Sequence, residues 1–432
     1  MKFPGKRKSK HYFPVHEKDP LLLHPASVQS KTHVIGIDQT MVDIEARVNK
    51  SFLEKYGLLK GHSLVINQDI AEKLHEELIS NNMINSEFAG GTIGNTLHNY
   101  SLLADNRSIL LGIMSKNIEI RSYSYKYLCN TSSRVDLNYL QGVDGPIGRC
   151  FALITKDGER TFAINEGCMN QLKPENIPET IFKNASALVI TSYLLRGQKD
   201  DPLPQATLKA IEFAKDNKIP VVLTLGTRFV IEDNPVWWQN FIKEHISVIA
   251  MNEEEAEALT GIKDPLLASD KSLDWADLVL CTSGPAGLYL AGYTEKKARR
   301  KTHLPLLPGA IPEFNRFEFS RPMRKSETKT PVKIYSHIAP YMGGPETIKN
   351  TNGAGDGALS ALLHDMSANS YHKDLVPNST KHKYKFLTYS SFSQICKYAN
   401  RVSYEVLAQH SPRLNRGLPE KEDSLEESYW ER

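Results

Sequence analysis

The sequence has no apolar run of about 18 residues, as a membrane-spanning helix would need, and its basic first residues lack the apolar stretch of a secretory signal. Its five cysteines are odd in number and widely spaced, with no CxxC pair, which argues against a disulfide framework or a thiolate zinc site. Neither sign of charge dominates, since 53 Lys and Arg residues stand against 50 Asp and Glu residues. We therefore expect a cytoplasmic protein with neither nucleic acid nor a membrane as its partner.

Several catalytic motifs are also absent. The sequence has no GxxxxGK[ST] motif, which excludes a P-loop nucleotide site, and it has neither the HExxH of zinc peptidases nor the GxSxG of α/β hydrolases. The rest of the composition, with 40% hydrophobic and 24% charged residues over 432 positions, is typical of a soluble globular protein with a large core.

Short apolar segments alternate with segments of helical periodicity along most of the chain. Fully apolar strands that alternate with helices indicate a mostly parallel sheet covered on both faces, so the fold class is α/β. The expected strands are 33–37, 109–113, 187–190, 221–225, 248–251 and 278–281, and the expected helices are 69–81, 205–217, 252–259 and 358–367.

Two regions depart from this alternation. Residues 116–165 have a β-like pattern with turns, and the Asp157-Gly158 pair between two apolar runs predicts a hairpin. We expect a small sheet here that stands apart from the body and covers something. Residues 292–334 are rich in Lys, Arg and Pro and predict an insertion with little regular structure. The expected organisation is a basic extension over 1–30, one domain over 31–417, and an acidic tail over 418–432.

The most informative segment is NTNGAGDGA, residues 350–358, which leads directly into an apolar helix. The amides of Gly353, Ala354 and Gly355 can converge at the positive end of that helix, which makes an anion site. An acid beside an anion site suits proton removal from a hydroxyl that attacks a phosphoryl group, so Asp356 is the candidate catalytic base. The alternative is a glycine-rich turn in which Asp356 caps the helix.

Four further segments carry weaker signals. In GGTIGN, Gly90 and Gly91 allow close approach to the backbone, and Asn95 offers a donor and an acceptor to a hydroxyl. Asp43 follows the first strand among apolar residues, where a carboxylate could accept hydrogen bonds from a vicinal diol. The alternatives are a tight turn for the first and a surface acid for the second. The other two are Asn252 to Glu255, which is also good helix-start chemistry, and the small-residue loop Thr282 to Gly287, which could line a phosphate channel.

Together and in this order, these segments resemble the ribokinase-like (PfkB) family of sugar and nucleoside kinases, over about residues 33–415. DQTMVDIEA is similar to that family's first substrate segment, GGTIGN and NTNGAGD to its two signatures, NEEE to its Asn-x-x-Glu motif and TSGPAG to its nucleotide loop. The resemblance implies a three-layer sandwich with a small β lid, which falls mainly within 116–165. It also implies a kinase that uses ATP and Mg²⁺ on a small molecule, with a homo-oligomer as an option.

The resemblance also implies a role for each matching residue. Asp356 would be the base for the ribose 5′-hydroxyl and Gly353, Ala354 and Gly355 the anion hole. Asp43, Gly91 and Asn95 would hold the ribose 2′ and 3′ hydroxyls, with Gly90 shaping the turn and Gln39 lying next to the substrate. Glu255, with Asn252, would organise Mg²⁺ through water, while Thr282, Gly284, Gly287 and Asn400 would line the ATP site.

Similarity along the whole chain, including HYFP near its start and LPEKEDSLEESYW at its end, is to the family's bacterial members that phosphorylate inosine and guanosine in purine salvage. The second signature departs from the family in opening with Asn350 where an acid of a monovalent-cation loop usually stands, which argues against K⁺ activation. The alternatives are a kinase for adenosine or a free sugar on the same fold, and a nucleoside-binding regulator without catalysis. No single motif selects the purine base.

Overall fold

The computed structural model describes residues 32–418 except 105, 199, 307 and 416. The expected N-terminal extension and residues 419–432 of the expected acidic tail lie outside this range. Among the described residues, no helix combines the length and the apolar character that crossing a membrane requires.

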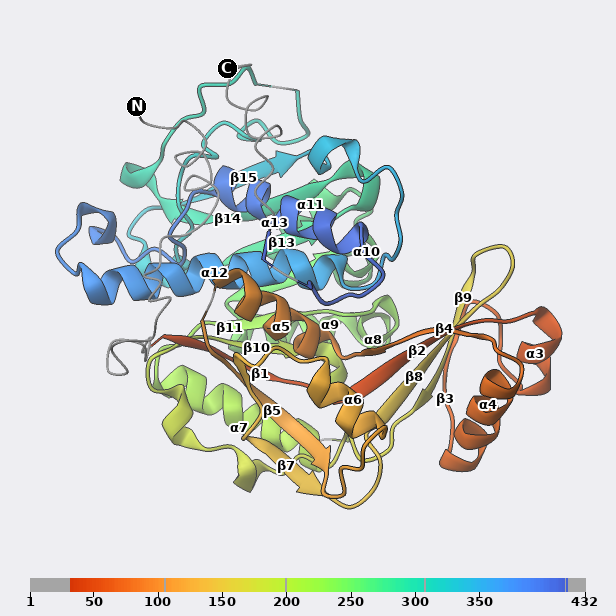
Figure 1. Cartoon of the computed structure of the whole chain (residues 1–432). Coiled ribbons are helices and arrows are strands. Elements are labelled where there is room, and N and C mark those ends of the chain that lie inside the picture. Colours follow the sequence, from red (N-terminus) through yellow and green to blue (C-terminus); the bar gives the residue numbers. More distant parts are fainter. Residues whose placement is uncertain (1–31, 105, 199, 307, 416, 419–432) are drawn as a thin grey trace, which may run out of the picture.

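The main sheet has ten strands, and its centre is parallel. The order is β15-β14-β13-β12-β11-β10-β1-β5-β6, with β7 beside β5 (Figure 1), and only the pairings of β14 with β13 and β15 are antiparallel. The bounds are β1 His33–Ile37, β5 Ser108–Ser115, β6 Val135–Asp136, β7 Leu140–Val143, β10 Ala185–Thr191, β11 Val221–Thr224, β12 Val248–Asn252, β13 Leu278–Thr282, β14 Leu288–Glu295 and β15 Pro331–Ile338. Each of the six predicted strands is found within one or two residues of its expected ends.

Helices cover both faces of this sheet, as the burial of its strands requires. Neighbouring residues of β1 alternate between two apolar cores: Val34 packs with one and Ile35 with the other. The helices α5, α12 and α13 contribute to the core of Val34, and α7, α9, α10 and α11 to that of Ile35 (Figure 1). Their bounds are α5 Thr92–Ala104, α7 Pro202–Asp216, α8 Arg228–Glu232, α9 Pro235–His245, α10 Glu253–Thr260, α11 Pro265–Ser272, α12 Ala354–Leu375 and α13 Phe392–Leu407. The predicted three-layer α/β sandwich is confirmed.

A second sheet projects from one end of the body (Figure 1), in the order β3-β9-β8-β2-β4. Its strands are β2 Met41–Arg47, β3 Ser63–Val65, β4 Ile84–Ala89, β8 Gly148–Ile154 and β9 Arg160–Asn165, accompanied by the helices α3 Lys50–Lys55, α4 Gln68–Ser80 and α6 Tyr123–Cys129. The predicted hairpin joins β8 and β9, with Gly158 at φ +85° in its turn.

The expected lid bounds need correction, because 116–165 supplies only β8 and β9 of the second sheet. Its earlier part forms α6 and the strands β6 and β7, which pair with β5 of the main sheet. The other three strands come from residues 41–89. The strand β2 alternates half-buried and buried residues and was not among the expected strands. Asp43, expected just after the first strand, lies on β2 and so belongs to the second sheet.

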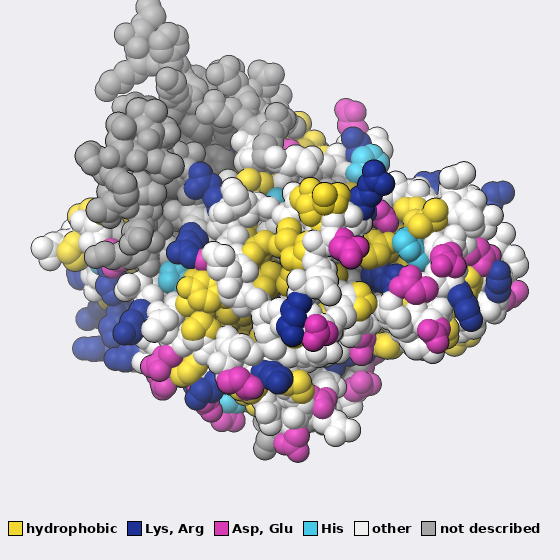
Figure 2. Space-filling model, turned by 60° about the horizontal axis from the view of Figure 1, so that its bottom comes forward, with side chains coloured by type: hydrophobic (Ala, Val, Ile, Leu, Met, Phe, Trp, Pro, Cys, Tyr) yellow, Lys and Arg dark blue, Asp and Glu magenta, His cyan; other side chains and the backbone are white. Residues whose placement is uncertain are grey.

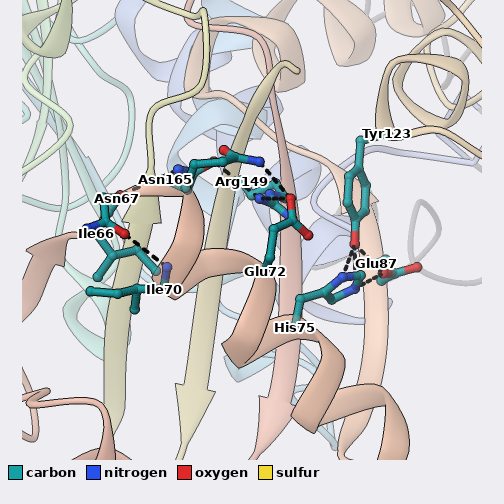
Figure 3. Close-up of polar contacts among 10 residues, drawn as sticks. Ile66, Asn67, Ile70, Glu72, His75, Glu87, Tyr123, Arg149 and Asn165 are labelled. Carbon is teal, nitrogen blue, oxygen red and sulfur yellow. Dashed lines mark hydrogen bonds and ion pairs between the residues drawn. The ribbon is translucent and has the colours of Figure 1, made fainter. Parts of the chain in front are cut away.

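Polar contacts fix one face of the second sheet to its helices (Figure 3). The buried Arg149 guanidinium donates to both carboxylate oxygens of Glu72 on α4, at 3.2 and 2.9 Å. The Tyr123 hydroxyl on α6 lies 2.5 Å from His75 Nε2 and donates to Glu87 on β4 at 3.4 Å. Since α4 and α6 occupy this face, the opposite face of the sheet is the one left for a ligand.

The predicted insertion joins β14 to β15 and is irregular but packed. Its ends belong to those two strands. Between them, the described residues form only the short 3₁₀ turns Lys296–Ala298 and Lys325–Glu327 and isolated bridges. Glu318 is nevertheless buried, and its carboxylate accepts hydrogen bonds from Thr302 and Ser336. The Phe392 and Ser393 amides also donate to the carbonyls of Ser320 and Glu318, so side chains and isolated backbone hydrogen bonds together anchor the segment to the body.

The surface in view carries both signs of charge. Over most of the face drawn in Figure 2, Lys and Arg side chains are interspersed with Asp and Glu side chains, and the apolar side chains gather toward its middle. This mixture agrees with the near balance of charge in the sequence.

Candidate active site

One cavity of about 1130 Å³ brings together the residues that the motifs singled out. It lies between the second sheet, the ends of the main-sheet strands and the start of α12. Every predicted site residue lines it except Gly90, which lies directly behind it against Asp43. The lining residues among the predicted set are Gln39, Asp43, Gly91, Asn95, Asn252, Glu255, Thr282, Gly284, Gly287, Gly353, Ala354, Gly355, Asp356 and Asn400.

Asp356 stands in the first turn of α12, a helix of 22 residues. Gly353 precedes the helix at φ +81°, and a Cβ atom there would lie 2.5 Å from Pro412, so the turn needs glycine. The first amides of a helix have no intrahelical acceptor, and because Gly353, Ala354 and Gly355 line the cavity, their amides are available to it as donors. Burial raises the pKa of Asp356, the hydrogen bond from Asn95 lowers it and the nearby Asp43 carboxylate raises it, so that the pKa is about 7. A carboxylate with this pKa is suited to take a proton near neutral pH.

Asn95 is oriented by a buried arginine that no motif indicated. Arg413 Nε donates to Asn95 Oδ1 at 3.0 Å, and Asn95 Nδ2 then donates to Asp356 Oδ2 at 3.2 Å. The same guanidinium donates to the Gly90 carbonyl at 3.1 Å and to Thr131 Oγ1 at 2.7 Å. Arg413 thereby connects the GGTIGN segment, through Gly90 and Asn95, to the candidate base Asp356. It follows α13 in a segment, SPRLN, that has no recognisable pattern.

Asp43 and Gly90 meet where β2 pairs with β4. An added Cβ atom on Gly90 would lie 2.6 Å from the Asp43 carboxylate, so the absence of a side chain makes room for that acid. Burial raises the pKa of Asp43 and the Arg413 guanidinium lowers it, so that the pKa is about 6. An ionised carboxylate has four acceptor positions, enough to take hydrogen bonds from two neighbouring hydroxyls.

Asp38 is a third acid of the site that sequence reasoning missed. Its carboxylate accepts hydrogen bonds from the amides of Gly94, at 2.6 Å, and Gln39, at 2.9 Å, and so holds the start of α5 against the end of β1. Burial raises its pKa to about 7. The sequence feature that could have indicated Asp38 is its position directly after a buried parallel strand, because ligands of α/β sheets bind at that end of the strands.

The opposite half of the cavity is built from α10, the β13–β14 connection and α13. Asn252 and Glu255 form a capping box at the start of α10, with the Glu255 amide donating to Asn252 Oδ1 at 2.8 Å and the Asn252 amide to Glu255 Oε2 at 3.0 Å. The helix-start interpretation is therefore realised, yet both residues also line the cavity. Burial and the Asp356 carboxylate raise the pKa of Glu255 to about 7, against the hydrogen bond from the Asn252 amide, which lowers it. Asn400 donates to the Ala339 carbonyl at 2.7 Å.

The second sheet is hydrogen-bonded to the loop that precedes α12. Arg160 on β9 donates to Asn352 Oδ1 at 2.6 Å, which joins this sheet to the loop before α12. Within the same loop, Asn350 is buried, accepts from the Asn352 amide at 2.9 Å and donates to the His410 carbonyl at 2.7 Å. The position where the signature usually has an acid is thus held by a neutral amide.

Comparisons with known proteins agree with this arrangement. The model of the "pfkB family carbohydrate kinase" matches residues 127–304. A guanosine-inosine kinase from Escherichia coli K12 is 69% identical over the full length of both chains. Among solved structures, an adenosine kinase from Sinorhizobium meliloti has a TM-score of 0.64 at 20% identity and covers 93% of this chain and 99% of its own. An adenosine kinase from Schistosoma mansoni with 2-fluoroadenosine has a TM-score of 0.59 at 15% identity, covering 91% and 98%.

The two structural likenesses establish the fold, and the full-length identity establishes the family. The motifs had predicted that family, and the prediction is confirmed. This chain belongs to the pfkB family of carbohydrate kinases.

Proposed function

We propose that this protein transfers the γ-phosphoryl group of ATP to the 5′-hydroxyl of guanosine and inosine, giving the 5′-monophosphates. The main support for this chemistry is the position of Asp356 at the start of α12, where backbone amides gather. Asp356 is hydrogen-bonded to Asn95 there, and both residues line the same cavity as Asp43. The choice of nucleoside rests on the identity of 69% to a guanosine-inosine kinase.

In this mechanism the nucleoside lies against the second sheet. Asp43 accepts hydrogen bonds from the ribose 2′ and 3′ hydroxyls, and Gly91 and Asn95 fix the sugar beside it. The 5′-hydroxyl then points at Asp356, which takes its proton as O5′ bonds to the γ-phosphorus. The bond from that phosphorus to the bridging oxygen breaks, and ADP leaves with the electron pair. The amides of Gly353, Ala354 and Gly355 stabilise the charge on the transferring group.

The nucleotide occupies the other half of the cavity, where Thr282, Gly284 and Gly287 line the phosphates and Asn400 lies toward the adenine. The Arg160–Asn352 contact holds the second sheet over this region and limits entry of water, which would otherwise compete as the acceptor.

The residues present fit Mg²⁺ bound mainly by phosphates and water. Among the described residues, no group of three or more His, Cys, Asp or Glu side chains could hold a metal ion alone. Mg²⁺ commonly keeps several waters and uses one or two carboxylates with substrate phosphates. Glu255 is the carboxylate that would contact such a hydrated ion, since its oxygens retain acceptor positions beyond those used by Asn252. The ion supplies charge neutralisation at the phosphates.

The direct test is turnover of the purified full-length protein with ATP and a panel of guanosine, inosine, adenosine and ribose. The proposal expects nucleoside 5′-monophosphate from guanosine and inosine at a kcat/KM at least tenfold above that for adenosine or ribose. A preference for adenosine or ribose would replace the proposed substrate while keeping the kinase. No phosphorylation of any acceptor would overturn the proposed activity.

A further inference from the structure

The cavity contains a carboxylate for which the proposed mechanism has no use. Glu166 lines it and directly follows β9, while its backbone carbonyl accepts from the Met169 amide at 3.1 Å. Among the residues that the structure describes, no side chain pairs with the Glu166 carboxylate. An acid that faces a ligand cavity without a protein partner has its acceptor positions available to the ligand.

The strand register places Glu166 relative to the ribose site. Asp43 on β2 lies opposite Cys150 on β8, and Cys150 lies opposite Ile164 on β9. Alternate residues of a strand share a face. The side chains of this face that line the cavity are Met41, Asp43, Ser63, Cys150, Ala152, Phe162, Ile164 and, one step beyond β9, Glu166. The face is mostly apolar, and its two carboxylates stand at separate positions on it.

The separation of these carboxylates suits a nucleoside. Two strand spacings of about 4.8 Å and a step of two residues along β9 put the Cα atoms of Asp43 and Glu166 about 12 Å apart. That is about the length of a purine nucleoside with a hydrogen bond at each end. The transfer centre lies on the other side of Asp43, because Gly90 and Asn95 follow β4, which pairs with the opposite edge of β2. A nucleoside held by Asp43 therefore points its base toward β9.

A pair of amides stands at the same end. Gln39 Nε2 donates to Asn170 Oδ1 at 2.5 Å, and both residues line the cavity. This bond occupies the Asn170 carbonyl oxygen and leaves its Nδ2 group as a donor. Asn170 lies four residues after Glu166 in the same turn, so an acceptor and a donor are presented side by side.

We propose that Glu166 and Asn170 read the six-membered edge of the purine and select a 6-oxopurine over adenine. This inference rests on the proposed nucleoside kinase function. Guanine and hypoxanthine present a proton on N1 and an acceptor at O6, which match the carboxylate and the amide donor. Adenine presents a lone pair at N1 and a donor at N6. Its N1 would face the carboxylate with no hydrogen between them, and a buried polar group left unpaired is costly.

The test compares Glu166→Gln with the wild-type enzyme on guanosine, inosine and adenosine at saturating ATP. The kcat/KM for guanosine is expected to fall about 10- to 100-fold, as for loss of a hydrogen bond to a charged group. The kcat/KM for adenosine is expected to hold or rise, because the glutamine amide can donate to N1. Glu159→Gln is the matched control, since Glu159 is an exposed acid of the β8–β9 turn and its loss should leave the guanosine-to-adenosine ratio unchanged.

Asn170→Asp provides a second, independent arm. It exchanges the donor facing O6 for an acceptor that suits the adenine amino group, so the guanosine-to-adenosine ratio should again fall. A Glu166→Gln enzyme that binds ATP normally and keeps the wild-type ratio would overturn the inference, and so would an unchanged ratio in Asn170→Asp. If the wild-type enzyme itself phosphorylates neither guanosine nor inosine, the proposed function fails first, and the two failures are thereby distinguished.

Discussion

Removal of the Arg413 cation is expected to shift the pH dependence of turnover. Its guanidinium reaches Asp356 through Asn95, by hydrogen bonds of 3.0 and 3.2 Å. These two bonds and the roughly 2 Å across the Asn95 amide put the charges at most about 8 Å apart, so at an effective dielectric constant of about 20 the attraction is about 2 kcal/mol. Since one pKa unit corresponds to about 1.4 kcal/mol, and solvent screens part of the attraction, Arg413→Met should raise the pKa of Asp356 by about one unit.

The sign follows from the state that the reaction needs. Asp356 must be ionised to accept the proton, and its pKa already lies at about 7 with Arg413 in place. Without the cation, the carboxylate ionises at higher pH, so the acid limb of the kcat/KM profile should move upward by about one pH unit. The measurement is kcat/KM for guanosine from pH 5.5 to 9 at saturating ATP.

Arg413→Lys separates charge from geometry. Lysine keeps the cation but loses the fork that donates to Asn95, Gly90 and Thr131 together, so its profile should keep the wild-type limb at a reduced maximal rate. An Arg413→Met enzyme with a reduced rate and an unmoved acid limb would contradict the reasoning, because a purely structural role lowers the rate without moving that limb.

Three further predictions concern the sugar, the metal and stability. Gly90→Ala places a methyl group where the Asp43 carboxylate lies, so KM for guanosine should rise at least tenfold while the affinity for ATP, measured by titration, stays the same. Glu255→Gln preserves a capping box, which glutamine also forms, but removes the charge, so the Mg²⁺ concentration for half-maximal rate should rise several-fold; an unchanged Mg²⁺ titration would remove Glu255 from the metal site. Glu72→Gln removes the charge that pairs with the buried Arg149, and the half-exposed position of Glu72 limits the loss of unfolding free energy to about 1 kcal/mol by urea denaturation; a loss near zero would show that the pair is only a surface ion pair.

The layers of the body could be predicted because their sequence signals are local. The apolar run of β1 and its neighbours is buried on both faces, so the residues alone indicate a parallel sheet. The helical spacing over 69–81 gives α4 within one residue at each end. The glycines and the acid of the second signature were likewise enough to place Asp356 at the start of a helix, since capping and helix-dipole chemistry depend on adjacent residues.

The parts that could not be predicted depend on contacts between distant segments. The second sheet joins strands from residues 41–89 to strands from 148–165. A local sequence pattern does not predict which of these strands pair. Arg413 lies 318 residues from the asparagine that it orients, in a segment with no motif. The role of Glu166 depends on a register across three strands. These residues were missed because their partners are distant in the sequence, and not because their interactions are weak.

The central claim is that the carboxylate of residue 356 removes the proton from the attacking hydroxyl. The most direct measurement is single-turnover phosphorylation of guanosine by Asp356→Asn, together with guanosine binding by calorimetry. The account predicts that the rate falls by about a thousandfold, the middle of the range of about 10²- to 10⁴-fold that a general base contributes, while the dissociation constant for guanosine changes less than threefold. A rate within tenfold of wild type at unchanged guanosine affinity would contradict it.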